Sequence, residues 1–143
     1  MCGICGIVDP SGPDREGLWR MTRALAHRGP DGEGIHVGPG FAFGHRRLSI
    51  IDLGSGSQPM CNEDGTVWIT FNGEIYNYKE LAESLKDRHV FKTHSDTEVI
   101  VHLWEELGER CVTRLRGQFA FAIHDARTGR LFAALDAGNP APR

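Results

Sequence analysis

The sequence predicts a single domain of the α+β class, because strand and helix patterns are mixed along one chain with no internal repeat or linker. Val67–Phe71 is a short run of β-branched and aromatic residues, which favours a strand. Phe119–Ile123 alternates large apolar residues with alanine, as a half-buried strand does. Leu18, Met21 and Leu25 recur at the spacing of one helical face, which indicates an amphipathic helix.

Local signals predict the other elements. In chain order we expect a strand over Ile4–Asp9, a helix over Asp14–Ala26, a loop over His27–Gly34, extended segments around His45–Arg47, a helix over Tyr78–Lys86 and a last strand over Leu131–Leu135. Asn72-Gly73 favours a tight turn directly after the strand that ends at Phe71. Ser95–Glu98 has the pattern of a capping box and opens another helix.

Composition and charge argue against several classes of protein. The chain has 143 residues, of which 40% are hydrophobic and 24% charged, with a formal net charge of −3. Charges of both signs are interspersed, so neither nucleic acid nor a membrane is an expected partner. No apolar run approaches the ~20 residues that span a bilayer, and no secretory signal is recognisable. Four scattered cysteines do not form a disulfide scaffold, so the expected compartment is the reducing cytoplasm.

Cys2 is a candidate nucleophile. If Met1 is removed, the free α-amino group of Cys2 can act as the base that deprotonates its own thiol, because the two groups have similar pKa values. Glycines and the predicted strand Ile4–Asp9 follow at once, so the new terminus would be held rigidly. The plain alternative is a frayed terminal cysteine without a role.

Cys2 and Cys5 also form a C-x-x-C pair, which could indicate a redox dithiol or half of a metal site. A redox pair normally follows a strand and opens a helix, whereas this pair precedes a strand. A zinc site would need a second pair, but Cys61 and Cys111 stand alone. We therefore expect Cys5 to be a core residue and predict no metal ligands in this domain.

Further polar residues would suit a pocket for a small amino acid. Arg47 could bind a carboxylate through two hydrogen bonds. Asn72 and Gly73 could supply the side-chain and backbone N–H groups of an oxyanion hole. Glu74 and Asp96 are carboxylates that could bind an ammonium group. Taken singly, each has a structural alternative: a surface charge, a hairpin turn or a residue in the first turn of a helix.

Six motifs occur in order along the chain: Met1-Cys-Gly-Ile-Cys-Gly-Ile-Val8, His27-Arg-Gly-Pro-Asp-Gly-Glu-Gly34, Arg47-Leu-Ser-Ile-Ile-Asp52, Phe71-Asn-Gly-Glu-Ile-Tyr-Asn77, Ser95-Asp-Thr-Glu-Val-Ile100 and Leu115-Arg-Gly-Gln-Phe-Ala-Phe-Ala122. Together they resemble the amidotransferase domain of glutamine-hydrolysing asparagine synthetases, a class II domain with an N-terminal nucleophile. The resemblance runs from residue 1 to about residue 135.

The resemblance implies an Ntn-hydrolase-like fold, a four-layer αββα sandwich of two antiparallel sheets. It implies that Cys2 attacks the side-chain amide of glutamine and that Asn72 and Gly73 form the oxyanion hole. It also implies these substrate-binding residues: Arg47, Ile50, Ile51, Asn72, Glu74 and Asp96. The products would be glutamate and ammonia, and the ammonia would serve the ATP-dependent amidation of aspartate in a synthetase domain.

The resemblance also sets expectations for domain limits and partners. Residues 1–135 would form the amidotransferase domain, incomplete at its C-terminal end, and 136–143 a tail without family character. No cofactor is expected in this domain, since ATP and Mg²⁺ belong to the synthetase domain. The partners would be glutamine, that synthetase domain and, in the longer protein, a second copy in a homodimer. The alternative is a truncated, inactive remnant of such a domain.

Removal of Met1 should be obligatory for activity, because an amide nitrogen at Cys2 cannot act as a base. Mass spectrometry of an active preparation should find Cys2 at the N-terminus. Full activity in a sample that still carries Met1 would rule out the N-terminal nucleophile.

Overall fold

The computed structural model describes residues 1–49 and 56–138. Its elements, in chain order, are β1 (Gly3–Val8), α1 (Arg15–Ala24), β2 (Gly32–Gly38), β3 (Phe41–Arg47), β4 (Met60–Cys61), β5 (Val67–Ile75), α2 (Tyr78–Leu85), α3 (Asp96–Leu107), the 3₁₀ helix η1 (Gly108–Arg114), β6 (Gly117–Asp125) and β7 (Arg130–Leu135). The strands and helices predicted from local patterns are present with small shifts at their ends.

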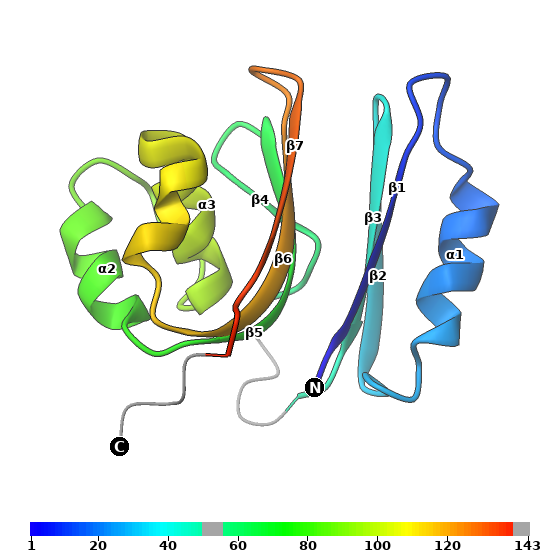
Figure 1. The fold of residues 1–143 in the computed structure, drawn as a ribbon, viewed down its shortest axis with the longest axis horizontal. Coiled ribbons are helices and arrows are strands. Elements are labelled where there is room, and N and C mark those ends of the chain that lie inside the picture. The colour runs from blue at the N-terminus through cyan, green and yellow to red at the C-terminus, as the bar shows by residue number, and fades with distance from the viewer. Residues whose placement is uncertain (50–55, 139–143) are drawn as a thin grey trace.

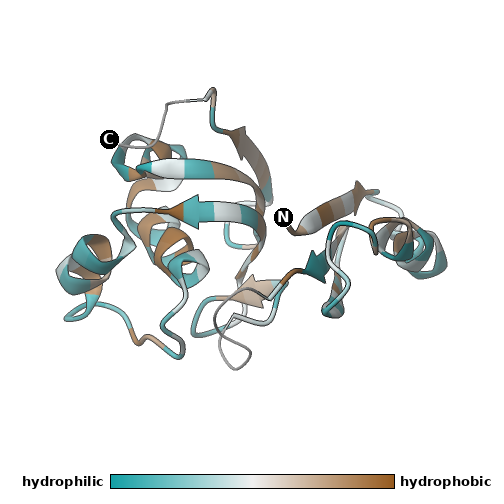
Figure 2. Cartoon of the chain, turned by 90° about the horizontal axis from the view of Figure 1, so that it is seen from below, coloured by the Kyte–Doolittle hydropathy of each residue, from teal (hydrophilic) through white to brown (hydrophobic). Residues whose placement is uncertain are grey.

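The elements form four layers (Figure 1). A three-stranded antiparallel sheet, β1-β3-β2, faces a four-stranded antiparallel sheet, β4-β5-β6-β7. Helix α1 covers the outer side of the first sheet, and α2 and α3 cover the outer side of the second. The predicted αββα sandwich is therefore confirmed. Seen from below, the N-terminus lies between the two sheets (Figure 2). None of the described helices has the length and hydropathy needed to cross a membrane.

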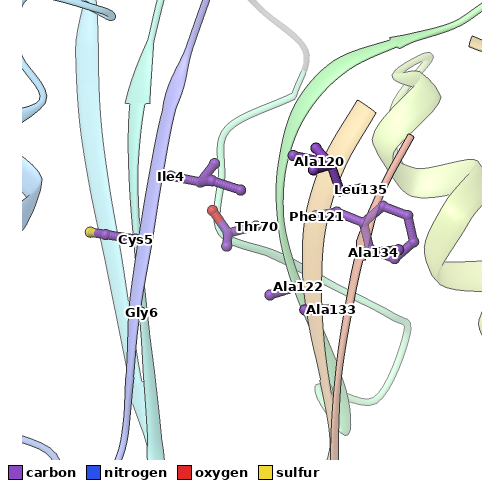
Figure 3. Close-up of a pocket in the computed structure, with 10 residues that line it drawn as sticks. All are labelled: Ile4, Cys5, Gly6, Thr70, Ala120, Phe121, Ala122, Ala133, Ala134 and Leu135. Carbon is purple, nitrogen blue, oxygen red and sulfur yellow. The ribbon is translucent and has the colours of Figure 1, made fainter. Parts of the chain in front are cut away.

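Strand β1 is oriented by a close contact between the first sheet and α1. A Cβ atom on Gly44 of β3 would lie 2.2 Å from Thr22 Oγ1 and 2.7 Å from Cys5 Sγ, so a larger residue would displace both side chains. Cys5 Sγ is 3.4 Å from Thr22 Oγ1. Because side chains alternate along a strand, Cys5 faces the helix and Ile4 faces the second sheet, as Figure 3 shows.

The main core lies between the second sheet and its helices. It is built from large apolar side chains that are at most 3% exposed: Ile69, Ile75, Leu85, Ile100, Leu103, Trp104, Phe121 and Ile123. Residues of β5 and β6 that point into this core alternate with residues that point toward the first sheet. Thr70, Asn72 and Glu74 belong to the second set, and this orientation decides what faces the N-terminus.

Two polar contacts join the sheets across the gap. His45 Nε2 lies 3.1 Å from the carbonyl oxygen of Phe71, and the hydroxyl of Thr70 donates to the carbonyl of Gly44 at 3.2 Å. His45 is only 3% exposed. Burial, reinforced by the charge of Arg47, lowers the pKa of His45 to about 4, although the bond to Phe71 acts in the opposite direction. The imidazole is therefore neutral near pH 7 and donates its Nε2–H to Phe71.

Stacked rings also fill part of the gap, His36 on Trp68 and Phe41 on His124, but the region beside β1 and β7 is incompletely filled. A cavity of 390 Å³ lies beside β1 and β7 (Figure 3) and is lined by Ile4, Cys5, Gly6, Thr70, Ala120, Phe121, Ala122, Ala133, Ala134 and Leu135. The side chains of β6 and β7 that border it are mostly alanines, which are too short to reach the opposite sheet.

The predicted turn at Asn72-Gly73 is wrong, because β5 continues through both residues to Ile75. Pairing with β6 over Gly117–Asp125 supplies partners that outweigh the local turn preference. The predicted loop His27–Gly34 is also too long, since β2 begins at Gly32.

The predicted capping box forms only in part. Ser95 Oγ accepts the N–H of Thr97 at 3.1 Å, as an N-cap residue should. Glu98 does not return to Ser95 but accepts the N–H groups of Lys92 and Thr93 at 2.7 and 2.8 Å. Glu98 therefore fixes the segment before α3 instead of closing the box.

Neutral His45 should make the fold sensitive to acid. Its pKa in the folded chain, about 4, lies below the ordinary value of 6.5, so protonation favours the unfolded chain. The resulting stabilisation is complete above pH 6.5 and is lost as the pH falls toward 4; at full extent it is about 3 kcal/mol.

Urea denaturation at pH 7, 5.5 and 4 tests this prediction. His45→Gln keeps an N–H donor but cannot gain a proton, so its unfolding free energy should fall less steeply with acid than that of the original chain. His94→Gln, at an exposed position, is the control and should keep the original slope. Equal slopes for all three proteins would contradict the role of His45.

Candidate active site

Cys2 lies at the start of β1, on the face that looks toward the second sheet. It shares this orientation with Ile4 by strand alternation, opposite to Cys5. The backbone N–H of Leu48 points at Cys2 Sγ at 3.4 Å, and Arg28 Nε donates to the Cys2 carbonyl at 3.2 Å. The nucleophile predicted from the sequence is thus held by contacts from two neighbouring segments.

The two thiols of the C-x-x-C pair lie on opposite faces of β1. All four cysteines, Cys2, Cys5, Cys61 and Cys111, are free. Cys5 contacts α1 through Thr22, whereas Cys2 lines a pocket between the sheets. This geometry argues against a dithiol or a shared metal ligand pair, because the thiols would have to turn toward each other through the strand.

The pocket beside Cys2 brings several predicted site residues together. Its volume is 220 Å³, and its lining is Met1, Cys2, Leu48, Asn72, Gly73, Glu74 and Gln118. Asn72 and Glu74 reach it because they alternate with the core residues of β5, and Gln118 lies opposite Glu74 on β6. Strand alternation therefore directs side chains from both sheets into one space around the sulfur.

Gly73 is required by the spacing of β5 and β6. Its φ is +147°, and a Cβ atom would lie 2.1 Å from the carbonyl oxygen of Gln118. Across the same pair of strands, a Cβ on Gly117 would lie 2.0 Å from the carbonyl oxygen of Glu74. The two strands therefore approach closely where they border the pocket, and no larger residue fits at either position.

Asp96 lies behind the pocket and supports its floor. Its Oδ2 accepts the backbone N–H of Ile75 at 2.9 Å, which fixes the end of β5 next to Glu74. Burial raises the pKa of Asp96 and the nearby charge of Glu74 adds to this effect, while hydrogen bonds from the Ile75 and Thr97 backbone oppose it. Glu74 and Asp96 thus form an acidic pair beside the pocket, although Asp96 is not among its lining residues.

Arg47 lies near Cys2 but borders a different hollow. Gly3 pairs with Arg46, so Cys2 and Arg47 are the next residues along neighbouring strands. Arg47 lines a 160 Å³ pocket together with Asp31, Glu33, His45, Ser49 and other residues. Ser49 N donates to Asp31 Oδ2 at 2.8 Å and Asp31 N donates to Arg47 O at 2.9 Å, which fixes this end of β3. The predicted backbone contacts at Ile50 and Ile51 lie outside the described residues.

Four residues of the pocket region were not predicted from the sequence as site components. The pocket is lined in part by Met1, Leu48 and Gln118, and the Cys2 carbonyl is held by Arg28. Gln118 could have been found by applying strand alternation to the Leu115–Ala122 motif. Arg28 and Met1 depend on tertiary contacts that no local pattern encodes.

Residues 1–139 match the family described as glutamine amidotransferase domain. The chain belongs to this family. An asparagine synthetase [glutamine-hydrolyzing] 3 from Arabidopsis thaliana is 49% identical over 140 residues, which cover 96% of this chain. An asparagine synthetase [glutamine-hydrolyzing] 2 from Bacillus subtilis (strain 168) is 46% identical over 141 residues, or 95% of this chain. The match spans only 24% of the Arabidopsis protein and 19% of the Bacillus protein.

A solved structure supports the fold of this amidotransferase domain. The glutamine phosphoribosylpyrophosphate (PRPP) amidotransferase from B. subtilis superposes with a TM-score of 0.69 at 23% identity. The match covers 94% of this chain and 36% of the other. At this level of identity the likeness extends to the arrangement of sheets and helices only.

Proposed function

We propose that this amidotransferase domain hydrolyses the side-chain amide of glutamine, with Cys2 as the nucleophile. The observation that carries the proposal is the pocket in which Cys2 of the first sheet faces Asn72 and Gly73 of the second. A thiol, an amide side chain and a glycine N–H are the groups that acyl transfer from an amide needs. The pocket is small, as a single amino-acid side chain requires.

The first step of the reaction depends on removal of Met1, which shares the pocket with Cys2 and is 68% exposed. The free α-amine of Cys2 then takes the thiol proton, and the thiolate attacks the amide carbon of glutamine. Asn72 Nδ2 and the N–H of Gly73 stabilise the oxyanion that forms. The ammonium of Cys2 returns its proton to the leaving nitrogen as the C–N bond breaks, which releases ammonia.

The second step hydrolyses the thioester formed in the first. The Cys2 amine accepts a proton from water, the hydroxide attacks the thioester carbon, and glutamate leaves as the thiol is restored. Substrate orientation is assigned to charged groups around the pocket: Arg47 for the α-carboxylate, Glu74 and Asp96 for the α-ammonium. Backbone groups of Ile50 and Ile51 complete the substrate contacts in this proposal.

The ammonia would serve asparagine synthesis. The relatives are named as glutamine-hydrolysing asparagine synthetases, which supports aspartate as the acceptor in a synthetase domain that uses ATP and Mg²⁺. The amidotransferase reaction itself needs no cofactor in this scheme. A reducing cytoplasm suits it, because Cys2 must stay a free thiol, and assembly as a homodimer would belong to the longer protein.

Glutamine hydrolysis by the purified chain tests the proposal. Release of ammonia and glutamate should depend on Cys2 and disappear in Cys2→Ala. Cys5→Ala is the matched control, because Cys5 lies three residues away on the other face of β1 and should leave turnover nearly unchanged. A chain that folds but hydrolyses no glutamine would be the inactive remnant, and activity that survives Cys2→Ala would exclude the proposed nucleophile.

Steady-state kinetics separate the roles of two other residues. Asn72→Ala should lower kcat by about 100- to 1000-fold with a small change in KM, because an oxyanion donor acts mainly in the transition state. Arg47→Lys should mainly raise KM, because lysine cannot make the two-pronged carboxylate contact. A rise in KM alone for Asn72→Ala would contradict its assignment to the oxyanion hole.

A further inference from the structure

A cluster of histidines and glutamates lies away from the Cys2 pocket, at the other end of the second sheet. Glu63 belongs to the turn between β4 and β5, His89 to the connection between α2 and α3, and His102 and Glu105 to α3. One donor atom from each of these side chains lies within 4.8 Å of all the others. The side chain of His102 is 1% exposed, whereas Glu63 lies at the surface, so the cluster is buried on the side of α3 and open at Glu63.

Four of the six distances between the donor atoms are close to those of a tetrahedral metal site. His102 Nδ1 is 3.4 Å from Glu63 Oε1 and 3.0 Å from Glu105 Oε1. His89 Nδ1 is 3.6 and 3.9 Å from the same two oxygens. Bonds of about 2.0–2.1 Å to a tetrahedral zinc ion separate its ligand atoms by about 3.3 Å. A small shift of His89 would therefore complete the coordination.

Outer carboxylates orient both imidazoles. His89 Nε2 lies 3.0 Å from Glu106 Oε1, and His102 Nε2 lies 3.4 Å from Glu98 Oε1. Glu106 is in turn held by Arg88 at 2.6 Å, and Glu98 by the backbone before α3. An Nε2–H that donates to a carboxylate leaves the Nδ1 lone pair directed at the centre of the cluster. This is the arrangement that usually surrounds histidine ligands of zinc.

The centre of the cluster needs positive charge. Two Nδ1 atoms and two carboxylate oxygens converge there, with His102 Nδ1 3.0 Å from Glu105 Oε1, and these groups would repel one another without a cation or added protons between them. We infer that four side chains hold a structural zinc ion: Glu63, His89, His102 and Glu105. Two imidazoles favour a transition metal over Ca²⁺ or Mg²⁺, which prefer oxygen ligands. Four protein ligands leave no open position, as in structural zinc sites.

The zinc ion would join three segments: the β4–β5 turn, the α2–α3 connection and the second half of α3. A direct hydrogen bond already links two of them, since the N–H of Val90 donates to Glu63 Oε1 at 3.2 Å. No metal ligands were predicted in this domain from the sequence. Local patterns do not point to this cluster, because Glu63, His89 and His102 are far apart in the chain and match no spacing motif, while His102 and Glu105 alone form an ordinary pair on one helix face.

Metal binding by the chelator-treated chain tests the inference. Titration with ZnCl₂ against a chromophoric chelator should give one ion per chain and a higher Tm. Substitution with Co²⁺ should give the strong visible absorption of a tetrahedral ion without a thiolate charge-transfer band, which excludes binding at cysteines. Absence of stoichiometric zinc binding in the original chain would overturn the inference and leave a protonated histidine–glutamate network as the explanation.

Matched variants locate the site. His89→Gln and Glu63→Gln should each weaken zinc binding by at least about 100-fold, and Glu106→Gln by about 10- to 100-fold through loss of orientation. The controls are His94→Gln, from the same connection as His89, and Glu109→Gln. Circular dichroism without metal should show that the variants are folded. Zinc affinity that is the same in His89→Gln and His94→Gln would exclude the proposed ligands.

Discussion

The hydrogen bond from His45 to the carbonyl of Phe71 joins the two halves of the candidate site. His45 stands two residues before Arg47 on the strand that pairs with β1, and Phe71 stands directly before Asn72. A nucleophile from one sheet and an oxyanion donor from the other can meet only if the sheets keep a fixed distance and register. A buried, neutral imidazole meets this requirement because it bridges the gap without introducing charge.

Much of the fold could be predicted from the sequence because its signals are local. The spacing of Leu18, Met21 and Leu25 located α1, and the alternation at Phe119–Ile123 located β6. The predicted apolar face of α1 was only partly right, because Met21 is 39% exposed and Thr22 is buried beside Leu18 instead. The turn predicted at Asn72-Gly73 was wrong, because pairing of β5 with β6 overrides the turn preference of this dipeptide. Tertiary contacts, such as that of Arg28 with the Cys2 carbonyl, could not be predicted because no local sequence pattern indicates them.

Some of the predicted site residues line the Cys2 pocket and others lie beside it, and the direction of their side chains explains the difference. Strand alternation directs four predicted residues into one pocket, namely Cys2, Asn72, Gly73 and Glu74. Arg47 borders an adjoining hollow instead, and Asp96 acts on the backbone of Ile75 from behind. Helix α3 connects the two ends of the second sheet, since it begins at Asp96 beside the pocket and carries the histidine–glutamate cluster near its other end.

Gly73 of β5 and Gly117 of β6 allow the two strands that border the pocket to approach closely. The atoms that a side chain at either position would meet belong to the main chain of the opposite strand, so no change of rotamer could make room. Any larger residue at either position would push the strands apart and carry the pocket-facing side chains with them. The two glycines therefore fix the spacing of the strands through the main chain alone. The side chains of the site cannot compensate for a change in that spacing.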